Sequence, residues 1–158
     1  MNSSSGSHTI DLVTPADLDA LLPLVRAYCD FYETAPTDEA LLDLSGALIA
    51  DPEREGVQLI ARDGGAQAVG FATVFWSWDT TEGGRIGIMN DLYVAPEARG
   101  SGLADSLIAE CVERCRTRGA SRLEWLTGPE NVRAQAVYDR VRGEREPWFV
   151  YTLAVPPA

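Results

Sequence analysis

The sequence predicts an α/β fold: a single domain with a mixed, mostly antiparallel central sheet flanked by about four helices. Three observations lead to this prediction. The chain has 158 residues, of which 46% are hydrophobic, enough for one continuous core. Segments with helical periodicity precede a run of alternating strands, and the rest of the chain interleaves strands with helices. A glycine-rich turn joins one strand directly to one helix.

A short strand and two helices are expected before the run of strands. The strand covers residues 9–13, and Thr14 and Pro15 then supply an N-cap and a first-turn proline for a helix. Apolar residues recur at three- and four-residue spacing along this helix, so that one stripe faces the sheet: Leu18, Leu21, Leu22, Val25 and Cys29. A second helix is expected from Asp38 to the break at residues 51–52.

The second half of the chain is expected to contain further strands and two more helices. Three strands cover residues 57–62, 68–78 and 85–94, with glycine-containing turns between them. A helix from Ser101 to a C-cap at Gly119 follows the glycine-rich turn. The remaining segments are a strand over residues 122–126, a helix over 131–142 and a closing strand over 148–155.

Residues 1–8 are polar and are interpreted as a disordered lead, which leaves residues 9–158 as a single domain. No apolar run approaches the ~18 residues that a membrane span needs, so we expect a soluble, cytoplasmic protein. Three cysteines suit a reducing compartment. Cys111 and Cys115 are expected to pack on one helix face, and no metal site is expected.

Charge is distributed unevenly along the chain. The formal net charge is −11, and every basic residue is arginine. Residues 1–60 contain 11 acidic side chains and two arginines, whereas residues 61–158 contain 13 acidic side chains and 11 arginines. A nucleic-acid partner is disfavoured because such proteins present a basic face. The acidic first part either attracts a cationic ligand or is a solvated surface that promotes solubility.

The segment over residues 92–104 has the features of a pyrophosphate-binding loop. Pro96 ends the strand because it cannot donate to a sheet ladder, and Gly100 and Gly102 allow a ligand to approach the backbone closely. The next helix directs its unpaired N–H groups and positive dipole end at the turn. A Walker loop would require Gly-Lys-Ser/Thr, and a dinucleotide loop would require a third glycine where Asp105 stands.

Arg99, Gly102 and Ala104 fit an Arg/Gln-x-x-Gly-x-Gly/Ala signature, by which the loop resembles that of the GNAT N-acetyltransferase superfamily. The predicted order of elements is similar to the GNAT fold from residue 9 onward. The resemblance implies acetyl-CoA as co-substrate, and a bulged strand whose free backbone N–H stabilises the oxyanion. It implies these cofactor-binding residues: Leu92 and Val94 on the strand, Arg99, Gly100, Gly102, Leu103 and Ala104 in the loop, and Asn131 farther on.

Asn131, Ala134 and Tyr138 match the Asn-x-x-Ala-x-x-x-Tyr helix of the same superfamily. By this resemblance Tyr138 is the general acid that protonates the departing CoA thiolate, since a phenol with a pKa of ~10 stays protonated at neutral pH. The alternative is that Tyr138 only packs on its helix. The superfamily places a glycine four residues after the tyrosine, whereas Gly143 is the fifth residue, so the turn leaving this helix is expected to differ.

The general base is the least determined part of the predicted site. Residues 91–94, Asp-Leu-Tyr-Val, resemble the diamine and polyamine acetyltransferase branch, in which a Glu often precedes the Asp. Asn90 occupies that place here, and an asparagine side chain cannot accept a proton. The base is therefore Asp91, another acid such as Asp79 or Glu33, or water alone.

Aromatic and acidic residues mark the predicted acceptor site. The resemblance places one wall of that site at the end of the first helix, where four such residues lie: Tyr28, Asp30, Tyr32 and Glu33. Trp76 and Trp78 alternate on one strand face and either line the acceptor channel or pack in the core. Rings and carboxylates together attract a cation.

The leading hypothesis is an N-acetyltransferase that moves acetyl directly from acetyl-CoA to an amine of a small, cationic acceptor, such as a polyamine, a diamine or an amino acid. A covalent route is disfavoured because no cysteine lies in the implied site, and the single histidine, His8, belongs to the lead. The alternative is a non-catalytic acyl-CoA-binding or sensing module. Many relatives are dimers, so a homodimer is expected.

Overall fold

The structure of the protein, a computed structural model, describes residues 7–158. These residues form two compact units, one that ends at Leu126 and one that begins at Thr127. Most of the expected lead therefore lies outside the described residues, and the domain boundary at residue 9 stays a prediction. The expected α/β class is confirmed: four α-helices and one mixed five-stranded sheet are present in the described chain.

The first unit contains the whole sheet, whose strands lie in the order β1-β2-β3-β4-β5. All neighbouring pairs are antiparallel except β4 and β5, which are parallel. The strands have these bounds: β1 Thr9–Leu12, β2 Gly56–Arg62, β3 Ala68–Asp79, β4 Gly84–Val94 and β5 Ala120–Glu124. Strand order follows chain order, so that antiparallel neighbours are joined by short turns or by the two-helix segment after β1.

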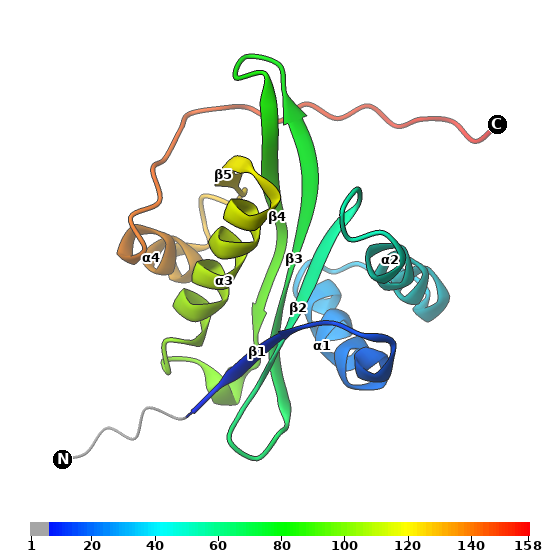
Figure 1. Cartoon of the computed structure of the whole chain (residues 1–158), viewed down its shortest axis with the longest axis vertical. Helices are drawn as coiled ribbons and strands as arrows, with labels where there is room; N and C mark the ends of the chain where they lie inside the picture. Colours follow the sequence, from blue (N-terminus) through cyan, green and yellow to red (C-terminus); the bar gives the residue numbers. More distant parts are fainter. Residues whose placement is uncertain (1–6) are drawn as a thin grey trace. The chain divides into compact units, whose positions relative to one another are not determined.

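Helices cover both faces of this sheet (Figure 1). Helices α1 (Leu18–Phe31) and α2 (Asp38–Ala50) lie on one face, and α3 (Leu103–Arg118) lies on the other. Short 3-10 turns precede α1 (Pro15–Asp17) and α3 (Pro96–Ala98). The core consists of side chains from both layers that have less than 2% exposure, among them Leu21, Leu59, Ile60, Phe71, Val74, Leu103 and Leu107.

Strand β4 carries a bulge in its second half. Thr73 of β3 pairs with Asp91, but the next residue, Val74, pairs with Met89, so Asn90 is the extra residue. On its other side β4 pairs with β5 only from Arg85 to Ile88. From Met89 onward, the edge of β4 that faces β5 has no strand partner among the described residues.

The second unit contains α4 (Val132–Arg140), which is capped at both ends. The side chain of Asn131 accepts a hydrogen bond from the N–H of Ala134 at 3.2 Å. After the helix, Arg142 adopts a left-handed conformation (φ 63°), and the N–H of Gly143 donates to the carbonyl of Tyr138 at 2.9 Å. Because the glycine comes one residue late, an arginine occupies the position that normally favours glycine.

The expected closing strand over residues 148–155 is not formed. Residues 143–158 have no regular secondary structure, and the large apolar side chains of Trp148, Phe149, Tyr151 and Leu153 are exposed. Aromatic and β-branched residues fit a pleated, half-buried surface, but a strand exists only where its backbone groups have a ladder partner. The prediction rested on the sequence pattern alone and is wrong for this structure.

The other predicted elements agree with the structure to within a few residues. Helix α1 begins at Leu18 because Pro15–Asp17 forms a separate 3-10 turn, and α3 begins at Leu103, with Gly102 as its N-cap. Strand β5 starts and ends two residues earlier than expected, directly after the left-handed C-cap Gly119 of α3. Helix and strand ends depend on caps and ladder partners, so such shifts are ordinary.

Candidate active site

The loop between β4 and α3 has an open, glycine-lined surface. Gly100 and Gly102 adopt left-handed conformations with φ of 76° and 82°. A Cβ at either position would find no atom within 4 Å, so space lies beside both residues. Arg99 is exposed and donates from Nε to the carbonyl of Val94 at 3.0 Å, which ties the loop to the end of β4.

The N-terminus of α3 faces this loop without a side-chain cap. Gly102 is the N-cap residue and, having no side chain, makes no side-chain cap hydrogen bond. Leu103 is buried and anchors the first turn in the core, while Ala104 presents only a methyl group. First-turn N–H groups that lack partners within the helix, the positive end of a 16-residue helix and open space beside two glycines together fit the pyrophosphate of a coenzyme.

The second half of β4 directs backbone groups of Leu92 and Val94 away from β3. The N–H of Ala95 donates to the carbonyl of Val69 on the β3 side at 2.8 Å. Hydrogen bonding alternates along an antiparallel ladder, so the N–H groups of residues 92 and 94 point to the edge where β5 is no longer paired. The Val94 carbonyl on this edge accepts from Arg99, and the two N–H groups are suited to bind an extended, amide-containing chain.

Asp91 lies beside the bulge and is partly buried. Its Oδ1 accepts from the Asn90 amide at 2.9 Å, and the hydroxyls of Thr73 and Tyr28 also hydrogen-bond to the carboxylate. Burial raises the pKa of Asp91 above its ordinary value, and these three donors oppose the rise. The result is a carboxylate of increased basicity that three neutral groups hold in place.

Tyr28 brings the end of α1 to this carboxylate. Its hydroxyl lies 3.1 Å from the carbonyl oxygen of Asn90 and also reaches the Asp91 carboxylate, and its single proton is donated to one of these two acceptors at a time. Burial, together with the nearby Asp91 and Tyr32, raises the pKa of Tyr28, so the phenol stays protonated and acts as a donor. Sequence positions 62 residues apart thus meet at one site.

An aromatic cluster continues from Tyr28 to the surface. The ring of Tyr28 lies 5.0 Å from that of Tyr32 and 5.9 Å from that of Phe71, and Phe31 lies 5.0 Å from Tyr32, measured between centroids. Phe31 and Tyr32 are about half exposed. Asp30 and Glu33 are exposed at the same helix end, so rings and carboxylates share this surface.

Trp76 and Trp78 do not join this cluster. Side chains alternate along β3, so both tryptophans lie on the face opposite Thr73, whereas Asp91 pairs with Thr73. Trp76 donates from Nε1 to the carbonyl of Pro52 at 2.8 Å. Trp78 is 66% exposed and stacks under the guanidinium of Arg85, 4.3 Å from the ring centroid.

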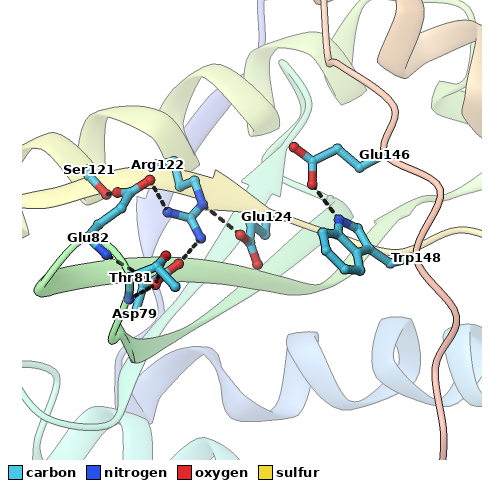
Figure 2. A network of polar contacts seen from close by, with 8 residues as sticks. All are labelled: Asp79, Thr81, Glu82, Ser121, Arg122, Glu124, Glu146 and Trp148. Atoms are coloured by element: carbon cyan, nitrogen blue, oxygen red, sulfur yellow. Dashed lines mark hydrogen bonds and ion pairs between the residues drawn. The ribbon is translucent and has the colours of Figure 1, made fainter.

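Asp79 is held in an ion-pair network at the tip of the β3–β4 hairpin (Figure 2). Arg122 of β5 pairs with Asp79 and, at 2.6 Å each, with Glu82 and Glu124. The hydroxyl of Thr81 donates to Asp79 at 2.6 Å. Arg122 and Thr81 hold the pKa of Asp79 well below its ordinary value, so this carboxylate is a poor proton acceptor. Of the two aspartates considered as base, Asp91 has the suitable environment.

Other chemistry has little support in the described residues. Cys111 and Cys115 are buried on the sheet-facing side of α3, as expected, and burial raises their pKa to about 12 and about 11. Both are therefore protonated thiols rather than nucleophiles. Within residues 7–158 no group of three or more His, Cys, Asp and Glu side chains is placed to hold a metal ion, and no helix is long and apolar enough to cross a membrane.

Two residues of this site escape prediction from the sequence, Thr73 and Gln58. Both lie in the middle of strands that are otherwise apolar, and both are buried. A polar residue inside an apolar strand is a signal in itself, because burial without a partner is costly. The identity of the partner depends on strand register, which periodicity does not determine.

An open glycine turn at a helix N-terminus, a bulged strand with an unpaired edge and a partly buried carboxylate thus all lie in the first unit. Residues 20–143 match the model of the Acetyltransferase (GNAT) family. The chain belongs to the GNAT acetyltransferase family, and its enzyme class is that of the GNAT-type acyl-CoA N-acyltransferases, with acetyl-CoA as co-substrate.

Relatives and a solved structure agree with this assignment. The chain is 34% identical to the uncharacterised N-acetyltransferase YhfO of Bacillus subtilis, over 89% of this chain and 93% of the relative. It is 27% identical to a thialysine N-epsilon-acetyltransferase of Caenorhabditis elegans, over 89% and 88%. The crystal structure of a probable acetyltransferase is similar with a TM-score of 0.80 at 30% identity, over 95% of this chain and 99% of the other.

Proposed function

We propose that this enzyme transfers the acetyl group of acetyl-CoA directly to a primary amine of a small, cationic acceptor: a polyamine, a diamine or a basic amino compound. Asp91 is the proton acceptor in this proposal. The observation that carries it is the position of the Asp91 carboxylate, beside the bulge of β4 and against Tyr28 at the acidic, aromatic end of α1. The acceptor amine enters from that end.

The cationic character of the acceptor is inferred from charge and rings at the end of α1. Asp30 and Glu33 add negative charge there, and the rings of Tyr28 and Tyr32 offer faces to an ammonium group. The excess of acidic residues before residue 60 strengthens the attraction over a longer range. The nematode relative, which is named for the N-epsilon nitrogen of thialysine, supports an amine acceptor.

The coenzyme lies along the β4 edge and the β4–α3 loop in this proposal. Residues 99–104, which include Gly100 and Gly102, bind the pyrophosphate with backbone N–H groups at the start of α3. The backbone groups of Leu92 and Val94 bind the pantetheine arm and the thioester carbonyl. An N–H at this edge stabilises the negative charge that develops on the carbonyl oxygen.

The reaction follows with protons and bonds in balance. Asp91 removes a proton from the acceptor ammonium, and the freed amine nitrogen forms a bond to the thioester carbon. The carbon–sulfur bond then breaks, and the thiolate takes a proton from Tyr138. The second amine proton restores the phenol of Tyr138 and the proton on Asp91 passes to solvent, so the products are the acetylated amine, free CoA thiol and one released proton. Asn131 is assigned to the coenzyme together with Tyr138, because both match the family's motif.

A raised pKa makes Asp91 a better base than an ordinary aspartate, because proton transfer is most efficient when the pKa of the acceptor approaches the working pH. This compensates for the asparagine at position 90. Glu33 is exposed and serves the acceptor rather than the proton transfer. The non-catalytic acyl-CoA-binding alternative is less favoured, because the relatives are named as acetyltransferases. A homodimer and a cytoplasmic location complete the proposal.

The test combines the wild type with Asp91→Asn. Thiol release from acetyl-CoA is measured with spermidine, putrescine, lysine, glutamate and a neutral amine as acceptors, and the acetylated product is identified by mass. We expect amine-dependent release that favours the cations, and a loss of turnover of ~10²- to 10⁴-fold in Asp91→Asn with unchanged CoA affinity. Wild-type turnover in the variant would remove Asp91 from the base role.

A further inference from the structure

A row of polar side chains crosses three neighbouring strands behind Asp91. Gln58 of β2 pairs with Thr73 of β3, and Thr73 pairs with Asp91 of β4. Paired residues of neighbouring strands share a face, so the three side chains lie next to each other. Gln58 is 4% exposed and Thr73 is fully buried, in a core whose neighbouring residues are apolar. Such groups require hydrogen-bond partners within the protein.

The hydrogen bonds of this row have a direction. Gln58 donates from Nε2 to Oγ1 of Thr73 at 3.2 Å. A hydroxyl carries one proton, so Thr73, which accepts on the Gln58 side, donates to its other neighbour. That neighbour is the Asp91 carboxylate, with which Thr73 hydrogen-bonds. The amide of Gln58 therefore orients the hydroxyl, and the hydroxyl orients and stabilises the carboxylate.

The oxygen of the Gln58 amide is the unusual part of the row. Oε1 is buried and has no hydrogen-bond partner among the described residues. An unsatisfied buried acceptor is destabilising, and an apolar side chain of similar length at position 58 would avoid it. Rotation of the amide by 180° would let Oε1 accept from Thr73, whose oxygen could then accept from a protonated Asp91. The row thus has a hydrogen-bonding arrangement for each protonation state of the carboxyl group.

We propose that Gln58 and Thr73 are positioning residues for the proton acceptor. Through the directed hydrogen bonds of the row, they hold the Asp91 carboxyl group toward the acceptor amine in its protonated and its deprotonated state, and so set its proton affinity. The proposal deepens the proposed function and rests on it. Other groups also face Asp91: the Tyr28 hydroxyl from α1 and the Asn90 amide on β4, both neutral. The charged groups nearest in the sequence to Tyr28 are Arg26, which forms an ion pair with Asp38, and the exposed Asp30, followed by the exposed Glu33.

Three variants of the row separate positioning from packing. Thr73→Val keeps the shape of the side chain and removes the hydroxyl, Thr73→Ser restores the hydroxyl, and Gln58→Met removes the amide. The matched control is Thr81→Val, which removes a hydroxyl from another aspartate, Asp79, at the far end of β3. Thermal unfolding of each variant verifies that it is folded.

Two readouts are compared. The first is an NMR titration of the Asp91 carboxyl carbon in protein that carries labelled aspartate. The signal of Asp91 is identified as the one that is missing from the spectrum of Asp91→Asn. The second is the pH profile of kcat/KM for acetyl transfer to spermidine. Loss of a hydrogen bond to a carboxylate raises its pKa by about one to two units in Thr73→Val. We expect the NMR midpoint and the acidic limb of the profile to move together to higher pH by that amount, and less in Gln58→Met. Thr73→Ser and Thr81→Val should stay at the wild-type position.

The outcomes distinguish the two levels of the proposal. An unchanged NMR midpoint in Thr73→Val would overturn the positioning role, whether or not the wild type is active. A midpoint that moves while the pH profile of the active enzyme stays in place would overturn the assignment of Asp91 as base and, with it, the positioning role. A wild type that transfers no acetyl group to any amine would overturn the proposed function itself.

Discussion

Replacing Gly102 with glutamate is expected to abolish coenzyme binding while preserving the fold. Gly102 is the N-cap of α3 and adopts φ 82°, a conformation that costs a side-chain-bearing residue about 1–2 kcal/mol. No atom lies within 4 Å of the Cβ position, so open space surrounds the first atom of the new side chain. The cost to stability is therefore the backbone strain alone, and Gly102→Ala carries the same strain.

The effect on binding comes from charge. A carboxylate roughly 5 Å from a phosphate repels it by about 1–3 kcal/mol per charge, for effective dielectric constants of about 20–80. Two phosphate charges give roughly 2–6 kcal/mol, which weakens CoA binding by ~30-fold to more than 10⁴-fold. Gly102→Ala lacks this repulsion and should stay within about tenfold of the wild type.

Calorimetric titration of both variants with CoA measures the difference directly, and thermal unfolding reports whether the two are equally stable. Equal CoA affinities for Gly102→Glu and Gly102→Ala would refute the assignment of this loop to the pyrophosphate. A Gly102→Glu variant much less stable than Gly102→Ala would contradict the open space that the structure shows beside this residue.

Three further predictions concern the acid, the acceptor and the hairpin. Tyr138→Phe should lower kcat by ~10- to 1,000-fold with little change in acetyl-CoA affinity, and an unchanged kcat would make Tyr138 structural. Neutralising Asp30 and Glu33 together should reduce the preference for spermidine over glutamate. The wild-type KM for spermidine should also rise with salt concentration. If the double variant keeps its preference, these two acids do not bind the acceptor and only form part of the solvated surface. Arg122→Leu should lower the Tm at pH 7. The hydrogen bond from Arg122 lowers the pKa of Asp79 below 3.8, so the pair stabilises the fold fully above pH 3.8 and less as the pH falls further. The decrease in Tm caused by Arg122→Leu should therefore shrink toward pH 3. A decrease that is the same at both pH values would exclude the ion pair as its cause.

Local signals sufficed for the helices, for most strands and for the glycine turn before α3. The glycines at 100 and 102 predicted an open turn before a helix, and both adopt the left-handed conformations that glycine favours. The bulge was expected from the resemblance, and the structure places it at Asn90. These features depend on residues close together in the chain, so a sequence pattern carries them.

Contacts between distant segments required the structure. Strand register brings Gln58 and Thr73 into line with Asp91, and the approach of α1 to the bulge brings Tyr28 to the same carboxylate. Alternation suggested a shared role for Trp76 and Trp78 but not which face of the sheet they occupy. The closing strand failed for the same reason, since propensity does not supply a ladder partner.

The most direct test of the enzyme's proposed activity is the stoichiometry of acetyl transfer. The purified protein is incubated with acetyl-CoA and spermidine, and free CoA thiol and N-acetylspermidine are measured in parallel, with Asp91→Asn as the control. We expect equal amounts of the two products over many turnovers, at a rate that requires both substrates and falls at least ~10²-fold in Asp91→Asn. Tight CoA binding without amine-dependent thiol release, for spermidine and for the other amines of the panel, would contradict it.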